Sequence, residues 1–243
     1  MDLSTRLILL DIEGTTSSVS YVFEVMYPFA KEKLPEFLEK NWDSEKVQAG
    51  CNQLAKDVGA VGVDAWGDDP VVRRARVVEE ANRLIDNDVK ATGLKELQGL
   101  IWAEGYEAGE LKSHLYPDVV PALRQWKEEG LEISIFSSGS IKAQKVFFKY
   151  TECGDLSDCL SGHYDTTTGP KKEAQSYNLI SSDFGVEPSR VVFLSDVVAE
   201  LDAAREAGMK TILVKRPGNK PVNDPNGHAA IESFDQLKFS LAV

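Results

Sequence analysis

Two carboxylates follow an apolar run near the start of the chain, in a pattern that suits chemistry at a strand end. The run Leu7–Leu10 is typical of a strand buried on both faces in a parallel sheet, and Asp11 and Glu13 come after it. Side chains alternate along an extended segment, so we expect both acids on one side and Ile12 on the other. Gly14 then permits a turn that a residue with a Cβ would resist. Taken alone, the pattern also fits a solvated strand end followed by a turn.

Polar residues end two later apolar runs in the same way. Ser137 and Ser138 follow the run 131–136, and Asp196 follows the run 191–194 after one serine. The carboxyl ends of parallel strands meet at one edge of a sheet, where open α/β folds bind their ligands. We therefore expect these side chains to converge with the two acids after the first strand.

Carboxylates from two strands and a nearby lysine pair favour phosphate chemistry with a divalent metal. Asp11 and Asp196 offer the hard oxygen ligands of Mg²⁺, which also keeps waters and takes a phosphate oxygen. Serine hydroxyls, backbone N–H groups and an ammonium from the pair Lys171 and Lys172 would hold the other phosphate oxygens. A carboxylate could then attack phosphorus and form an aspartyl-phosphate. Glu13, the second acid, would protonate the leaving alkoxide and then activate water.

Strands and helices alternate through the second half of the chain. Such alternation indicates β-α-β units and a doubly wound parallel sheet of the α/β class. We predict helices over 118–129, 142–150, 172–184 and 199–207, with further strands over 160–164 and 211–214. The segment 231–237 is expected to pack on the edge of this core.

A long helical block separates the first predicted strand from the second. Pro28 and Pro35 are expected to start or break helical segments within it. We predict an α/β core from 1–18 and 115–243 and a helical cap over 19–114 that governs substrate specificity. Apolar residues recur at helical spacing in three sets: Val47, Cys51, Leu54 and Val58; Val71, Ala75, Val78 and Ile85; and Leu94, Leu97 and Ile101.

Composition excludes several classes of function. The 243 residues suit one domain with an insertion or two small domains, and no apolar run approaches the roughly 20 residues of a membrane span. A net charge of −12 argues against nucleic acid and anionic membranes as partners. The start of the chain leaves no room for a signal peptide before the first strand. Three cysteines without Cys-x-x-Cys spacing fit a reducing cytoplasm. We also expect the protein to be a monomer.

The motifs together resemble the haloacid dehalogenase superfamily of phosphohydrolases and, more closely, the enolase-phosphatases of methionine salvage. The similarity extends from the first strand to about Arg216. Glutamate at position 13, where most of the superfamily carries aspartate, marks the subfamily. The matching segments are Leu-Asp-Ile-Glu-Gly-Thr-Thr at 10–16, Phe-Ser-Ser-Gly-Ser at 136–140, Gly-Pro-Lys-Lys-Glu-Ala-Gln-Ser-Tyr at 169–177, Phe-Leu-Ser-Asp-Val at 193–197, and the cap segment 94–111.

The resemblance implies a role for each candidate residue around one Mg²⁺ per chain. Asp11 is then the nucleophile and a metal ligand. Glu13 is the acid and base, and it contributes to the metal site, in other members through its backbone carbonyl. Ser137 and Ser138 then bind substrate oxygens. Lys171 neutralises the phosphate and the aspartyl-phosphate, and Asp196 completes the metal site.

The family reaction converts 2,3-diketo-5-methylthiopentyl 1-phosphate to an enol and then removes phosphate to give acireductone. The base for enolisation stays open. A general small-molecule phosphatase of the superfamily would share the same core. A haloacid dehalogenase needs neither Glu13 nor a Mg²⁺ site, and a non-catalytic binding protein would typically have lost Asp11, Glu13 or Asp196, which are all present.

Several further residues keep two interpretations. Lys172 is expected to be a solvated helix residue, because motif position favours Lys171 as the phosphate ligand. Glu200 has two interpretations. It either orients a neighbour, which is Lys171 or a water bound to the metal, or it is an exposed charge on a helix. The cap aromatics Trp66, Trp102 and Tyr106 either line a methylthio pocket or belong to the cap core.

Overall fold

The computed structural model describes residues 2–242, which divide into two units. One unit comprises the residues up to Tyr21 and those from Lys112 onward, and the other is Val22–Leu111. The insertion predicted over 19–114 is thus three residues longer at each end than the second unit. No helix in the described part of the chain is both long and apolar enough to cross a membrane.

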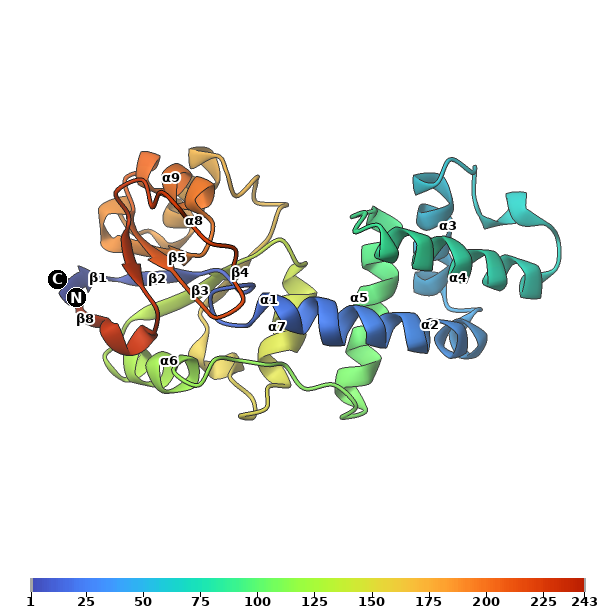
Figure 1. The fold of residues 1–243 in the computed structure, drawn as a ribbon, viewed down its shortest axis with the longest axis horizontal. Coiled ribbons are helices and arrows are strands. Elements are labelled where there is room, and N and C mark those ends of the chain that lie inside the picture. The colour runs from blue at the N-terminus through green and yellow to red at the C-terminus, as the bar shows by residue number, and fades with distance from the viewer. Residues whose placement is uncertain (1, 243) are drawn as a thin grey trace. The chain divides into compact units, whose positions relative to one another are not determined.

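The first unit is built on a six-stranded, wholly parallel sheet with β2 near its middle (Figure 1). Figure 1 shows α8 and α9 on one face and α6 and α7 on the other, which confirms the doubly wound α/β class. In sheet order the strands are β4 (Gly162–Tyr164), β3 (Glu132–Phe136), β2 (Leu7–Leu10), β5 (Val191–Ser195), β6 (Lys210–Val214) and β7 (Ala229–Ile231). The helices are α6 (Val119–Glu128), α7 (Ile141–Lys149), α8 (Ala174–Phe184) and α9 (Val198–Glu206).

The register of the central strands brings the predicted polar residues to one edge. Leu10 pairs with Ile135 of β3 and with Leu194 of β5, so the three strands end side by side. All four residues of β2 are fully buried, as expected for a strand covered on both faces. The sheet therefore presents the chain that follows β2, β3 and β5 at its carboxyl edge.

The two ends of the chain form structure that the sequence did not indicate. The strands β1 (Asp2–Thr5) and β8 (Lys238–Leu241) pair in parallel as a separate two-stranded sheet. The strand β7 was not predicted either, although Ile231 and Leu237 are buried as expected. Helix α8 begins at Ala174, two residues later than predicted, because the chain turns before it.

The second unit contains helices and no strand among its described residues. Pro28 lies in the first turn of α2 as predicted, whereas Pro35 lies inside α2, so the prediction that each proline starts or breaks a segment is wrong for Pro35. The segments leading into and through the unit are α1 (Val19–Tyr21), a π-helical turn Val22–Met26, α2 (Tyr27–Asn41), α3 (Glu45–Asp57), a 3₁₀ turn Val63–Trp66, α4 (Pro70–Asp86) and α5 (Thr92–Glu107).

The predicted core faces of α3 and α5 are buried, apart from Val58, which is partly buried at the end of α3. The predicted face of α4 is right only in part. Val78 and Ile85 pack partly buried against the cluster, but Val71 is 60% exposed, and the fully buried residues of α4 include Val77, Ala81 and Leu84. Both stripes have helical spacing, so periodicity alone could not separate them. The buried cluster of this unit includes Val47, Cys51 and Leu54 from α3 and Leu94, Leu97 and Ile101 from α5.

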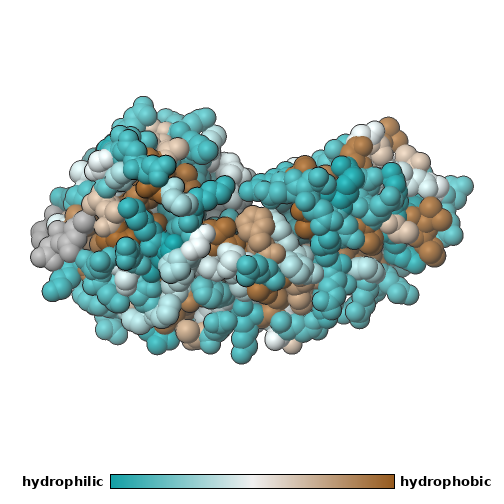
Figure 2. Space-filling model, viewed as in Figure 1, coloured by the Kyte–Doolittle hydropathy of each residue, from teal (hydrophilic) through white to brown (hydrophobic). Residues whose placement is uncertain are grey.

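The surface is mostly hydrophilic in the view of Figure 2. Its exposed hydrophobic side chains include Val61, which is 87% exposed, and Val72, which is 50% exposed. Both belong to the helical unit.

Close contact between α3 and α5 depends on a glycine. A Cβ on Gly93 would overlap the backbone nitrogen of Leu54 and lie 2.5 Å from its Cα. The Gly93 N–H also donates a 2.7 Å hydrogen bond to Asp57 Oδ2. By contrast, a Cβ on Gly99, in the same helix, would meet nothing within 4 Å.

We expect Gly93→Ala to lower the free energy of unfolding by about 1–3 kcal/mol or more, because backbone cannot move aside as a side chain can. Gly99→Ala is the matched control and should be neutral or stabilising by up to about 1 kcal/mol, since alanine is the better helix former. Urea unfolding measures both variants. Equal stability of the two would contradict the close approach of α3 and α5.

Candidate active site at the carboxyl edge of the sheet

Lys171 joins two buried carboxylates at the carboxyl edge of the sheet. Its Nζ lies 2.7 Å from Asp11 Oδ1 and 2.7 Å from Glu200 Oε2. The Lys171 side chain is only 9% exposed, and the two carboxylates are similarly buried. The structure therefore brings together two of the predicted site residues and a third that the sequence left ambiguous.

Each member of this cluster is held by a different element. Asp11 follows β2, and its backbone N–H donates to the carbonyl of Leu194 in β5 at 3.0 Å. Lys171 lies in the turn before α8, where the Tyr177 hydroxyl donates to its carbonyl at 2.7 Å. Glu200, in the first turn of α9, accepts a 3.0 Å hydrogen bond from Ser195 Oγ. The lysine is thus fixed at its backbone and at its ammonium group.

These contacts settle two of the alternatives left by the sequence. Glu200 is 8% exposed and bonded to Lys171, so it is not an exposed helix charge. Lys172 is exposed, but it lies in the turn before α8 and not in the helix as predicted.

The acidic edge carries more negative than positive charge. Burial alone would lower the pKa of Lys171, but Asp11 and Glu200 outweigh it, and the pKa of this lysine is raised. Burial, then the charges of Asp11 and Glu200, raise the pKa of Asp196 to about 7. Three carboxyl groups, those of Asp11, Asp196 and Glu200, thus act on one another beside a single ammonium group. A divalent cation at this edge would offset the excess of acidic groups.

The donor set suits a metal that retains water. Among residues 2–242, no group of three or more His, Cys, Asp and Glu side chains forms an all-protein metal cage. Mg²⁺ does not require one, because it usually binds one or two carboxylates and keeps several waters. Asp11 and Asp196, with the surplus charge around them, therefore fit Mg²⁺ better than a metal that needs a full set of side-chain ligands.

The chain after Asp11 turns sooner than predicted. The strand β2 ends at Leu10, and the carbonyl of Ile12 accepts hydrogen bonds from the N–H groups of Thr15, Thr16 and Ser17. The strand thus ends before Asp11, and the placement of Asp11 and Glu13 on one side of the chain stays a prediction. Glu13, which is partly exposed, forms an isolated bridge with Ser17.

Gly14 allows Asp196 to approach this turn. Its φ is +72°, in the left-handed region that favours glycine. A Cβ at this position would clash with Asp196 Oδ2. Gly14 therefore provides both the backbone conformation and the space beside the carboxylate.

A buried glutamine that the sequence analysis missed braces the loop after β3. Gln144 Nε2 donates to the carbonyls of Gly139 and Tyr164, both at 2.8 Å. Within this loop Ser137 is buried and Ser138 is exposed. The only sequence signal for Gln144 was a polar residue on a helix one turn beyond the serine motif.

The cap aromatics take part in the packing of the helical unit. Tyr106 is 2% exposed. Trp102 packs against the buried cluster, stacks on Tyr27 and donates from Nε1 to the carbonyl of Met26 at 2.8 Å. Trp66 packs against the same cluster. These contacts favour the core interpretation, and the methylthio-pocket role stays a prediction.

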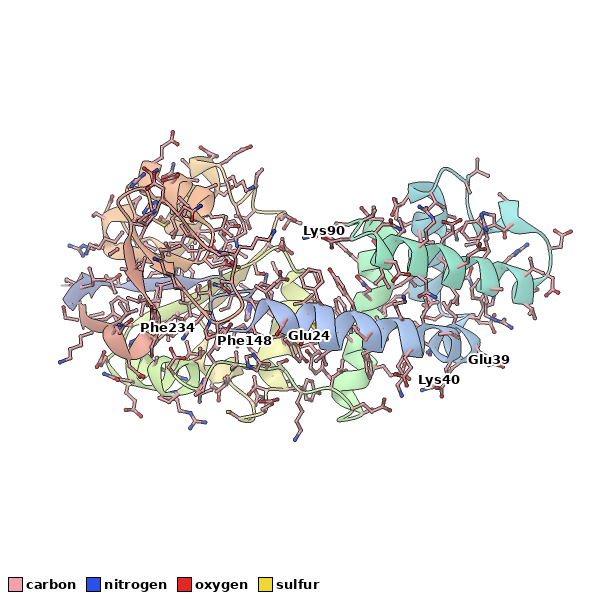
Figure 3. All side chains as sticks on the ribbon, viewed as in Figure 1. Glu24, Glu39, Lys40, Lys90, Phe148 and Phe234 are labelled. Atoms are coloured by element: carbon pink, nitrogen blue, oxygen red, sulfur yellow. The ribbon has the colours of Figure 1, made fainter. Side chains whose placement is uncertain are left out.

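A segment near the end of the chain clamps the turn after Asp11. Arg216 Nε donates to the carbonyl of Thr15 at 3.0 Å, and its Nη1 pairs with Asp118 at 2.8 Å. The Arg216 guanidinium also lies 4.7 Å from the ring centroid of Phe234, a buried residue labelled in Figure 3. The turn after Asp11 is therefore tied to the C-terminal part of the fold.

Comparison with known proteins supports a family for this arrangement. Residues 5–208 match the model of the haloacid dehalogenase-like hydrolases. The enolase-phosphatase E1 of Pseudomonas fluorescens is 46% identical over 236 residues, 97% of this chain and 98% of that protein. The enolase-phosphatase E1 of Synechococcus elongatus is 45% identical over 241 residues, 98% of this chain and 99% of that protein. These matches confirm the resemblance seen in the motifs.

Solved structures share the fold of this chain. The crystal structure of the UTR4 protein from Saccharomyces cerevisiae has a TM-score of 0.78 and 34% identity, over 96% of this chain and 100% of that one. A dehalogenase structure has a TM-score of 0.56 and 18% identity, over 96% of this chain and 95% of that one, a likeness that shows the fold alone.

His163, which lies beside Gln144, is expected to make the stability of the protein depend on pH. Burial, and secondarily Lys145, lower the pKa of His163 from 6.5 to about 4, and its Nδ1 lies 3.3 Å from Gln144 Oε1. Unfolding restores the ordinary pKa, so the unfolded chain binds the proton first as the pH falls. The folded state therefore suffers no penalty from His163 above pH 6.5, and it loses stability relative to the unfolded chain as the pH falls towards 4.

We expect wild type to lose on the order of 2 kcal/mol more stability than His163→Asn between pH 7 and pH 4. Urea unfolding of both proteins across this range measures the difference, and the other titrating groups cancel. Parallel stability curves would contradict the depressed pKa.

Proposed function

Since the chain belongs to the haloacid dehalogenase-like hydrolases and, within them, to the enolase-phosphatase E1 family, we propose that it is a Mg²⁺-dependent enolase-phosphatase of methionine salvage. It converts 2,3-diketo-5-methylthiopentyl 1-phosphate to acireductone and phosphate by way of an enol phosphate. The observation that carries this proposal is the contact of Lys171 with Asp11 and Glu200, at 2.7 Å each, at the carboxyl edge of the sheet. A buried carboxylate oriented by an ammonium group suits nucleophilic attack on a phosphate.

One Mg²⁺ per chain would be held by the carboxylates of Asp11 and Asp196 and the backbone carbonyl of Glu13. When bound, the ion neutralises phosphate oxygens and so lowers the repulsion between the phosphate and the attacking carboxylate. The surplus of negative charge around Asp196 supports this assignment.

Asp11 is the nucleophile. One carboxylate oxygen bonds to phosphorus while the bond from phosphorus to the enol oxygen breaks, which leaves an aspartyl-phosphate. Glu13 gives its proton to the departing enol oxygen, so that the leaving group departs neutral. Glu13 then takes a proton from water, the water oxygen attacks phosphorus, and Asp11 is released with inorganic phosphate.

Lys171 neutralises the phosphate and the aspartyl-phosphate throughout. Its position beside Asp11 depends on Glu200, which is itself bonded by Ser195. Ser137 and Ser138 bind substrate oxygens from the end of β3. An ammonium and two hydroxyls provide the donors that a phosphate with three terminal oxygens requires.

The helical unit serves as a cap that governs substrate specificity, with the α/β core supplied by 1–18 and 115–243 and the cap by 19–114. We propose a monomer in the cytoplasm that acts on this small phosphorylated diketone and binds neither nucleic acid nor membranes. The net charge of −12 and three free cysteines support this environment.

The test of the function is an ultraviolet time course with the diketone phosphate and Mg²⁺, with phosphate release measured in parallel. We expect an enol-type absorbance that rises and then changes as phosphate appears. Phosphate release from many simple phosphoesters, with no enol signal from the diketone, would make this protein a general small-molecule phosphatase.

Asp11→Asn should reduce phosphate release by more than about a hundredfold, since the amide cannot act as the nucleophile. The substitution is isosteric, so circular dichroism and thermal unfolding should show a folded protein. Lys172→Ala is the control and should keep wild-type activity, because its side chain is exposed. Activity of Asp11→Asn above a hundredth of wild type would exclude Asp11 as the nucleophile.

A further inference from the structure

Polar atoms without partners gather around the turn that follows Asp11. Among the described residues, the buried side-chain atoms with no hydrogen-bond partner include Thr15 Oγ1, Arg216 Nη2 and Asn219 Oδ1. Thr15 belongs to this turn, and Arg216 and Asn219 bind its backbone. A buried acceptor without a partner costs about 1–3 kcal/mol, so such an atom calls for an explanation.

Asn219 has its amide group fixed in orientation. Its Nδ2 donates to the carbonyl of Gly14 at 2.8 Å and faces the carbonyl of Val214 at 3.4 Å. Reversal of the amide would place Oδ1 against two carbonyl oxygens, which cannot donate. The oxygen Oδ1 must therefore point away from these carbonyls.

The free oxygen of Asn219 lies near Asp196. Both Oδ1 of Asn219 and Oδ2 of Asp196 border the space where Gly14 has no Cβ, and a Cβ there would lie 2.9 Å from Oδ1 and would clash with Oδ2. The glycine thus lets a neutral acceptor and a carboxylate approach the same α carbon. Its neighbour in the chain is Glu13, whose carbonyl is proposed to bind the metal.

We propose that Asn219 is a positioning residue for the metal site, with Nδ2 holding the turn that carries the Glu13 carbonyl and Oδ1 accepting a hydrogen bond from a water bound to Mg²⁺. The inference rests on the proposed function, because it needs the ion at Asp11 and Asp196. Mg²⁺ retains several waters, whose hydrogens need acceptors. Groups that hydrogen-bond to metal ligands commonly change metal affinity or activity by 10–100-fold when they are replaced.

The test is the dissociation constant of Mg²⁺, measured by calorimetry on the full chain without substrate. Asn219→Ala should raise this constant about tenfold or more. Asn87→Ala is the matched control, because Asn87 Nδ2 donates to the carbonyl of Arg83 at 2.6 Å within the helical unit. It should leave the constant unchanged. Thermal unfolding without Mg²⁺ reports any loss of stability separately.

Asn219→Ser provides a second variant if the alanine variant does not fold, and it should also weaken Mg²⁺ binding. Wild-type affinity within twofold in a folded Asn219 variant would overturn the inference and leave the proposed function intact. Absence of Mg²⁺ binding by wild type would overturn both.

Discussion

The ammonium group of Lys171 is the contact on which the acidic edge of the sheet depends. It lies 2.7 Å from one oxygen of Asp11 and 2.7 Å from one oxygen of Glu200, in surroundings that exclude most of the solvent. Buried carboxylates without a cation are costly, and removal of one partner of a buried ion pair typically costs about 3–5 kcal/mol. The lysine therefore allows acidic side chains to gather at the edge where the phosphate and the divalent cation are proposed to bind.

The fold keeps this charge in place by several independent connections. The register of β2 with β3 and β5 aligns the three strand ends. The turn after Asp11 is closed by its own backbone bonds and held by Arg216 and Asn219 from the far end of the chain. Because these connections involve separate elements, Asp11, Glu13 and Asp196 need not be held by any one loop.

The sequence was most informative where physical constraints are local. Buried parallel strands must be apolar throughout, so Leu7–Leu10 and the runs before Ser137 and Asp196 were evident, and their ends indicated the site. The pairing of β1 with β8 was hidden, since it joins the two ends of the chain and neither strand is strongly apolar.

Contacts between distant residues explain the other gaps. The burial of Glu200 depends on Lys171, which lies on the other side of β5 in the sequence. Gln144 and Asn219 act through single amide groups, whose role emerges only when the backbone carbonyls around them are known. The buried face of α4 could not be predicted for a different reason. Two sets of its apolar residues have the same helical spacing, so spacing alone could not show which set is buried.

Chemical trapping of the phosphoenzyme tests most directly whether Asp11 is the nucleophile. Wild-type enzyme turning over the diketone phosphate with Mg²⁺ would be quenched in acid and reduced with borohydride, which converts an aspartyl-phosphate to homoserine. Peptide mass spectrometry would then locate the modified residue. Homoserine is expected at position 11 and nowhere else. Homoserine at position 196, or none under conditions of rapid phosphate release, would contradict this role of Asp11.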